Sequence, residues 1–135
     1  MAGGDPQILR TPYPKGDDGY VMLRTKTFST IASQTGLVFD TITVPFAFQA
    51  VYAEIAGVVT TAVGTTFTFQ DDTGTPKVII NAAPVATQAV GAVTALPVVR
   101  TVTINAGALL NCKYTTGAGD TSVATVITLW VKPVF

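Results

Sequence analysis

Two pairs of adjacent carboxylates, Asp17-Asp18 and Asp71-Asp72, come closest to a reactive or metal-binding arrangement. Calcium takes about six to eight oxygen ligands, usually with acids at alternating positions. Each pair lies close before a glycine, and acids beside glycine are typical turn residues because their side chains bind nearby backbone N–H groups. We therefore interpret both pairs as turns, and we predict neither a metal site nor an acid and base pair.

The other side chains that could take part in chemistry have no suitable partner residues in the sequence. The chain has no histidine, so an imidazole base and the usual serine or cysteine triads are absent. Asp40 and Glu54 could supply a glycosidase pair, but two carboxylates in a β protein are no signature by themselves. Cys112 alternates with Leu110 and Tyr114, which favours an apolar strand residue over a reactive thiol. We expect no enzyme, and no cofactor or metal.

The composition is unusual for its shortage of charge. Charged residues make up 12% of the 135 residues, against about 25% in ordinary soluble domains. Eight basic residues balance eight acidic ones, so no net field attracts nucleic acid or an anionic membrane. A net charge near zero promotes association. This surface suits a protein that is covered by partners, and nucleic acid is not expected among them.

Hydropathy gives no support for a membrane protein. The longest stretch without charge runs from Asn81 to Val99, but it contains two prolines and half of its apolar residues are alanine. A transmembrane helix needs about 20 strongly apolar residues. We predict a connection with one short strand there. The opening residues lack the basic and apolar regions of a signal peptide, so synthesis in a host cytoplasm is expected.

Alternation with a period of two dominates the chain after Gly19, and no segment keeps a helical period. Turn signals separate about eight predicted strands at the spacing of a sandwich or barrel, and their short turns favour an all-β antiparallel sandwich. The predicted strands cover residues 20–31, 37–44, 48–59, 64–70, 77–80, 98–104, 109–115 and 122–132. Residues 20–135 form the sandwich domain in this interpretation, and Gly57 marks a bulge in its strand.

The alternation also assigns the two faces of each strand. In the first strand Val21, Leu23 and Ile31 share a face, and Phe28 falls on the other. In the third strand Val51, Ala53 and Ile55 lie opposite Ala50, Tyr52 and Glu54. In the last strand the predicted core residues are Val123, Ile127, Leu129 and Val131.

The opposite face of the last strand carries Val126, Thr128 and Trp130 where a solvated face would show Lys, Glu or Gln. Threonine also suits an exposed strand, but a large apolar surface is usually an interaction site. We expect coverage by a neighbouring subunit. Trp130 and the tyrosines at 13, 20, 52 and 114 could instead form a sugar-stacking platform, although aromatic residues on strands more often pack in cores or interfaces.

Residues 1–19 differ from the rest of the chain. Three prolines oppose regular structure, yet Ile8, Leu9 and Tyr13 are apolar. Two interpretations stay open: a disordered terminus, or an extended N-terminal arm that docks on a neighbouring subunit through those three residues.

The whole chain resembles small virion proteins of tailed phages, particularly head decoration or cement proteins. The resemblance lies in the opening residues 1–6, the Thr/Ala/Val-rich strands and the closing segment 126–133, not in a motif. It implies a β-sandwich of jelly-roll type that forms a homotrimer on the capsid surface and clamps the major capsid protein. A tail, neck or head-fibre component would look alike, and a lectin-like carbohydrate-binding module is the alternative from another functional class.

Overall fold

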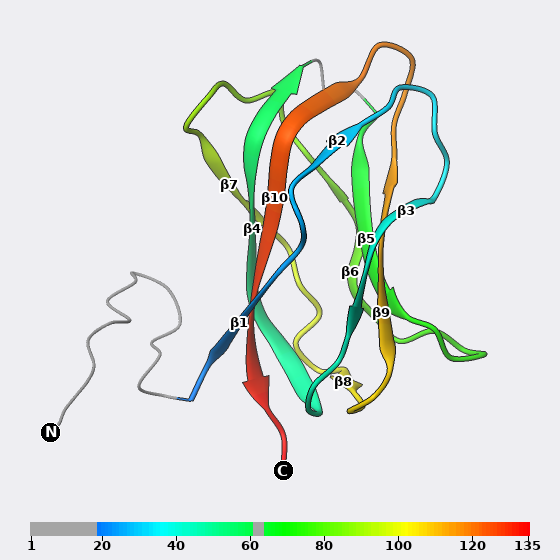
Figure 1. The fold of residues 1–135 in the computed structure, drawn as a ribbon, viewed down its shortest axis with the longest axis vertical. Helices are drawn as coiled ribbons and strands as arrows, with labels where there is room; N and C mark the ends of the chain where they lie inside the picture. The colour runs from blue at the N-terminus through cyan, green and yellow to red at the C-terminus, as the bar shows by residue number, and fades with distance from the viewer. Residues whose placement is uncertain (1–18, 61–63) are drawn as a thin grey trace, which may run out of the picture.

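The computed structural model describes residues 19–60 and 64–135, and within them every regular element is a β-strand. The strands form two antiparallel sheets that pack face to face, with β4 and β10 in one layer and β5 and β9 in the other (Figure 1). The predicted all-β antiparallel sandwich is confirmed. The proposed arm falls on residues 1–19, of which only Gly19 is described.

The first sheet is built on its two longest strands. Its order is β1 (Val21–Arg24), β10 (Thr121–Pro133), β4 (Phe48–Thr60) and β7 (Val93–Leu96). Two short strands extend its edges: β2 (Phe28–Thr30) pairs with β10, and β8 (Thr103–Ile104) pairs with β4.

The second sheet has four strands in the order β3 (Leu37–Thr43), β9 (Leu109–Thr115), β5 (Thr66–Asp71) and β6 (Val78–Pro84). The sequence predicts β5 and β9 of this sheet well, because their alternation is regular. Phe67 and Phe69 are buried between half-buried Thr66, Thr68 and Gln70, as expected.

The strand pairs are nested along the chain. β1 pairs with β10, β3 with β9, β4 with β7, and β5 with β6, as in one long hairpin whose closed end is the β5–β6 turn. Two further pairings, β10 with β4 and β9 with β5, join these ribbons into the two sheets. The sandwich is thus a single rolled ribbon.

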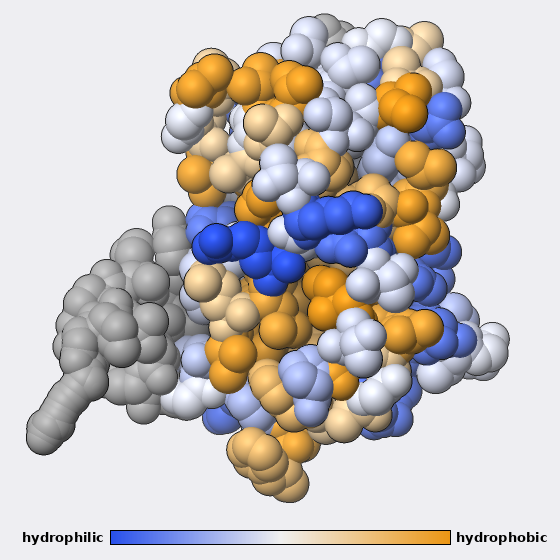
Figure 2. All heavy atoms as spheres, in the orientation of Figure 1, coloured by the Kyte–Doolittle hydropathy of each residue, from blue (hydrophilic) through white to orange (hydrophobic). Residues whose placement is uncertain are grey.

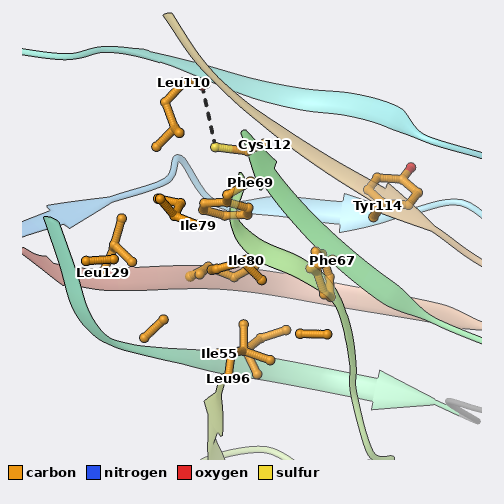
Figure 3. Packing of buried hydrophobic residues seen from close by; sticks show 14 of the residues in the cluster. Ile55, Phe67, Phe69, Ile79, Ile80, Leu96, Leu110, Cys112, Tyr114 and Leu129 are labelled. Carbon is orange, nitrogen blue, oxygen red and sulfur yellow. Dashed lines mark hydrogen bonds between the residues drawn. The ribbon is translucent and has the colours of Figure 1, made fainter. Parts of the chain in front are cut away.

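Both sheets contribute to one core between the layers. Phe67, Phe69 and Tyr114 of the second sheet face Ile55 and Leu129 of the first (Figure 3). Phe28 and Phe39 stack with ring centroids 3.9 Å apart, and this pair joins the two sheets near their edge. Every one of these side chains is at least 91% buried, because none of them exceeds 9% exposure.

The predicted strand over residues 20–31 is broken, and its faces were partly wrong. Lys26 leaves the ladder because its N–H donates to the Asp40 carboxylate at 2.9 Å. Lys26 and Thr27 are both exposed, and this pair of exposed residues reverses the alternation. Phe28 is consequently buried, and Ile31, expected beside Leu23, is 59% exposed.

The predicted strand over residues 98–104 is reduced to β8. After Pro97 the chain leaves the first sheet, and the N–H of Val99 donates to the carbonyl of Ile79 at 2.8 Å. It pairs with β4 again only at Thr103 and Ile104. The short strand expected between Asn81 and Val99 is present as β7.

Two bulges between β4 and β10 change which side chains face the core. On β4, Val51 is an extra residue between the pairs Trp130–Tyr52 and Val131–Ala50, so Ala50 is buried, contrary to its predicted face. On β10, two residues, Ala124 and Thr125, lie opposite Gly57 alone. The bulge predicted at Gly57 in its own strand is therefore found in the partner strand β10, opposite Gly57, and it turns Val123 outward to 52% exposure.

Candidate subunit interface

The predicted acid pair Asp71-Asp72 forms a turn. The Asp71 carboxylate is buried and accepts hydrogen bonds from the Lys77 N–H at 2.8 Å, the Thr73 hydroxyl at 2.8 Å and the Thr73 N–H at 3.3 Å. Burial alone would raise the pKa of Asp71, but these hydrogen bonds lower it below its ordinary value. Asp72 accepts from the Leu109 N–H at 3.2 Å.

Asp40 and Glu54, the other predicted acid pair, lie in different sheets. Asp40 lies on β3 in the second sheet and accepts from Lys26 and Thr41, whereas Glu54 lies on β4 in the first sheet. The structure therefore does not bring these two carboxylates onto one strand pair. Within the described ranges no three of the Cys, Asp and Glu side chains gather as metal ligands would, and Asp17-Asp18 lies outside those ranges.

Cys112 occupies the interior of β9. Its side chain is fully buried in the core, as Figure 3 shows, and its thiol lies 3.9 Å from the carbonyl oxygen of Leu110. Burial, and to a smaller extent the charge of Asp40, raise the pKa of Cys112. A protonated, inaccessible thiol has the character of a core residue, as the sequence predicts.

The sheet face that carries the predicted interface residues is the outer face of the β1–β10–β4–β7 sheet. Cross-strand pairing brings Val126, Thr128 and Trp130 together there, opposite Ala56, Glu54 and Tyr52 of β4 respectively. Ile8, Leu9 and Tyr13 lie outside the described residues. We divide this outer face into two halves because its chemistry changes at Thr128.

The half around Trp130 is covered from within the subunit. The Trp130 and Tyr52 rings lie 5.5 Å apart between centroids, Met22 is the cross-strand partner of Trp130, and Arg24 that of Thr128. The Arg24 guanidinium donates to the Thr128 hydroxyl at 3.3 Å. Trp130 is only 9% exposed and Thr128 6%, so these two predicted contact residues offer little surface of their own.

Glu54 is the acid of this outer face. Its side chain is half-buried beside Thr128, and Ala95 of β7 lies opposite it on the other side. Burial raises the pKa of Glu54, and the positive charge of Arg24 partly offsets that rise. A half-buried carboxylate whose desolvation Arg24 offsets only in part favours an incoming positive charge.

The other half of the outer face has no charged side chain. One cross-strand row joins Val126, Ala56 and Val93, and the next row joins Val123 and Val58. Val93 and Val123 are 54% and 52% exposed, and the other three are half-buried. We call these five residues the apolar patch. Figure 2 shows apolar residues along the upper left margin, over the ends of β7 and β4.

Sequence reasoning found Val126 but missed the other four members of the apolar patch. Val123 joins the outer face only because of the bulge at Ala124 and Thr125. Val93 belongs to a segment that the sequence predicts largely as a connection. The signal that could have found Val58 and Ala56 was their spacing of two on either side of Gly57.

The aromatic residues do not form a shared platform. Tyr114 is 1% exposed in the core, where its hydroxyl accepts a hydrogen bond from the Ile31 N–H, while Tyr52 and Trp130 pack on each other on the outer face. Tyr20 lies half-buried just before β1, and Tyr13 is outside the described residues. A sugar-stacking ring must present its face to solvent, and Trp130 does not.

Comparisons with protein-family models, with curated proteins and with solved structures each find no match to this chain. Among residues 19–60 and 64–135 there is also no helix with the length and apolar character needed to cross a membrane.

Proposed function

We propose that this chain is a structural virion protein of the capsid decoration or cement type, without catalytic activity. It binds the outside of a phage head and stabilises the particle through contacts between subunits. Its partners are further copies of itself, as a homotrimer, and the major capsid protein. The apolar patch is the observation that carries this proposal.

The physical argument begins with the cost of exposing the patch. Val93 and Val123 are each more than half exposed, and the patch contains no charge to keep it solvated. Burying apolar surface gains roughly 25 cal/mol per Å². Contiguous exposed apolar surface on a soluble protein usually marks an interaction site. A chain with 12% charge and no net charge has little repulsion to prevent such contact.

The topology supports the same class of protein. We infer that the nested pairing of β1–β10, β3–β9, β4–β7 and β5–β6 is a jelly roll, since a jelly roll is a long hairpin rolled into two sheets. Viral capsid and lectin domains both use this fold. Fold alone does not decide between them, so the argument depends on the surface.

A cement protein needs only buried surface and repetition. A single contact of a few apolar side chains is weak, but several contacts per trimer and many trimers per particle give avidity. A tail, neck or head-fibre subunit would use the same physics. The lectin alternative loses its best residue, because Trp130 is 9% exposed.

A charge placed in the patch tests the proposal. Val93→Asp should shift the protein toward the monomer on a sizing column, because the carboxylate would be buried between copies. Thr41→Asp is the matched control, since Thr41 is exposed on β3 of the other sheet. Equal elution of both variants and the parent protein would contradict a role for the patch in assembly.

A further inference from the structure

We propose that the apolar patch binds residues 8–13 of a neighbouring copy of this chain. The inference deepens the proposed function and rests on its premise that copies pack together. Residues 8–13 of one copy would then cover the outer face of the next copy. Each copy would bind a segment from one neighbour and place its own segment on another.

The patch and the segment match in chemical character. The patch offers only aliphatic side chains in two short rows, Val126–Ala56–Val93 and Val123–Val58. Residues 8–13 carry three apolar side chains, Ile8, Leu9 and Tyr13, within a stretch of 18 residues that is otherwise rich in Gly, Pro and charge. Three apolar side chains of such a segment can pack against the five aliphatic side chains of the patch.

The charges at the border of the patch are complementary to those of the segment. Arg10 is the only charged residue between Ile8 and Tyr13. Glu54 is the next residue along β4 from Ala56 on the same face, and it is half-buried, with the positive charge of Arg24 acting on it. When Leu9 covers the patch, Arg10 falls within reach of a carboxylate that has already lost part of its water.

The position of β1 favours binding of the segment to the patch of a neighbouring copy over binding to the patch of its own copy. Val21 pairs with Val131 near one end of β10, whereas the patch begins at Val126 and ends at Val123. At about 3.3 Å per residue these positions are roughly 17 to 26 Å apart along the strand. Residues that precede β1 and continue its direction lead away from the patch of their own copy, so only a reversal would return them to it.

The segment is long enough to reach another copy. Tyr13 lies eight positions before Val21, and fully extended this stretch would span up to about 26 Å. That length exceeds the width of the four-stranded part of the first sheet, whose strands lie about 4.8 Å apart. The segment can therefore leave its own sheet edge and lie across the outer face of an adjacent subunit.

Chemical cross-linking of the full chain tests this inference. The double variant Leu9→Cys with Val126→Cys is treated with a short bis-maleimide and analysed on a denaturing gel. Cys112 is fully buried, so the parent protein serves as the unreactive control. We expect covalent dimers and larger species with this pair. Leu9→Cys combined with Thr41→Cys, on the outer face of the other sheet, should give at most one tenth as much.

The outcomes separate this inference from the proposed function, because the mass of the same sample is measured by light scattering. An oligomer that gives no more links at position 126 than at position 41 would overturn the docking of the segment and leave self-assembly standing. A link formed only within one chain, seen as a modified monomer, would also overturn it. A monomeric sample would overturn both.

Discussion

Gly57 lies directly against the backbone of Thr125. A Cβ atom on Gly57 would be 2.8 Å from the Cα of Thr125 and 2.8 Å from its hydroxyl oxygen, and the φ of Gly57 is +147°. This contact is the centre of the bulge that turns Val123 outward, and a second strained residue, Ala124 with φ 49°, lies beside it. The apolar patch therefore depends on a glycine that no other residue can replace without strain.

Gly57→Ala should lower the free energy of unfolding by about 2 kcal/mol or more, because the new methyl group meets fixed backbone and the φ is unfavourable. Urea denaturation measures the change. Gly74→Ala is the control, since a Cβ there meets nothing within 4 Å. If the two variants unfolded at the same urea concentration, the close approach to Thr125 would be incorrect.

Leu129→Ala should cost about 2–5 kcal/mol of stability, because Leu129 is 1% exposed between the two sheets. Val123→Ala on the same strand should cost less than about 1 kcal/mol, since Val123 is 52% exposed. Chemical denaturation of both variants compares the two faces of β10. The reverse order of the two costs would mean that the faces of this strand are exchanged.

Asp71 should make the protein less stable in acid. Its folded-state pKa is lowered, so its contribution is present above the ordinary pKa of about 4 and is lost as the pH falls through the lower folded value. Asp71→Asn should remove this part of the pH dependence and cost about 1–3 kcal/mol at pH 7.

Thr73→Val tests the loss of one hydrogen bond to the Asp71 carboxylate, whereas Asp71→Asn removes the carboxylate itself. Thr73→Val removes the hydroxyl donor at 2.8 Å and leaves the carboxylate with its two backbone donors. Thermal unfolding between pH 2 and 7 should show a reduced acid-dependent loss for Thr73→Val and the smallest loss for Asp71→Asn. Parallel pH profiles for the parent protein and Asp71→Asn would contradict the role of this carboxylate.

Trp130→Ala should affect folding rather than sugar binding. The ring is 9% exposed and packs on Tyr52, so its removal should lower stability by about 3 kcal/mol. Binding of the parent protein to immobilised glycans should be absent. Met22→Ala, its exposed cross-strand neighbour, is the control for a surface change. Glycan binding that Trp130→Ala abolishes while the protein stays folded would favour the lectin alternative.

The sequence predicts the fold where alternation is unbroken and fails where it shifts by one residue. The whole of β9 and the inward-facing Phe67 and Phe69 follow from a strict period of two. Val123 and Ala50 were assigned to wrong faces because each lies beyond a bulge, and only the register of the partner strand fixes the position of a bulge.

The candidate site was less predictable for the same reason. Val126, Thr128 and Trp130 do share a face, but Trp130 is 9% exposed there, beside Tyr52 and Met22, which are distant in sequence. The apolar patch combines residues of β4, β7 and β10. The pairing of Val93 with Ala56 arises only in the folded structure and cannot be inferred from composition. The shortage of charge indicated that partner subunits cover part of the surface, but it did not indicate which part.

The solution mass of the unaltered chain, measured by light scattering on a sizing column, tests most directly whether copies of this protein cover one another. The account predicts a homotrimer, which for a chain of 14.0 kDa has a mass of about 42 kDa. A single species of 14.0 kDa at every concentration would contradict it, because the apolar patch would then be exposed in the finished molecule.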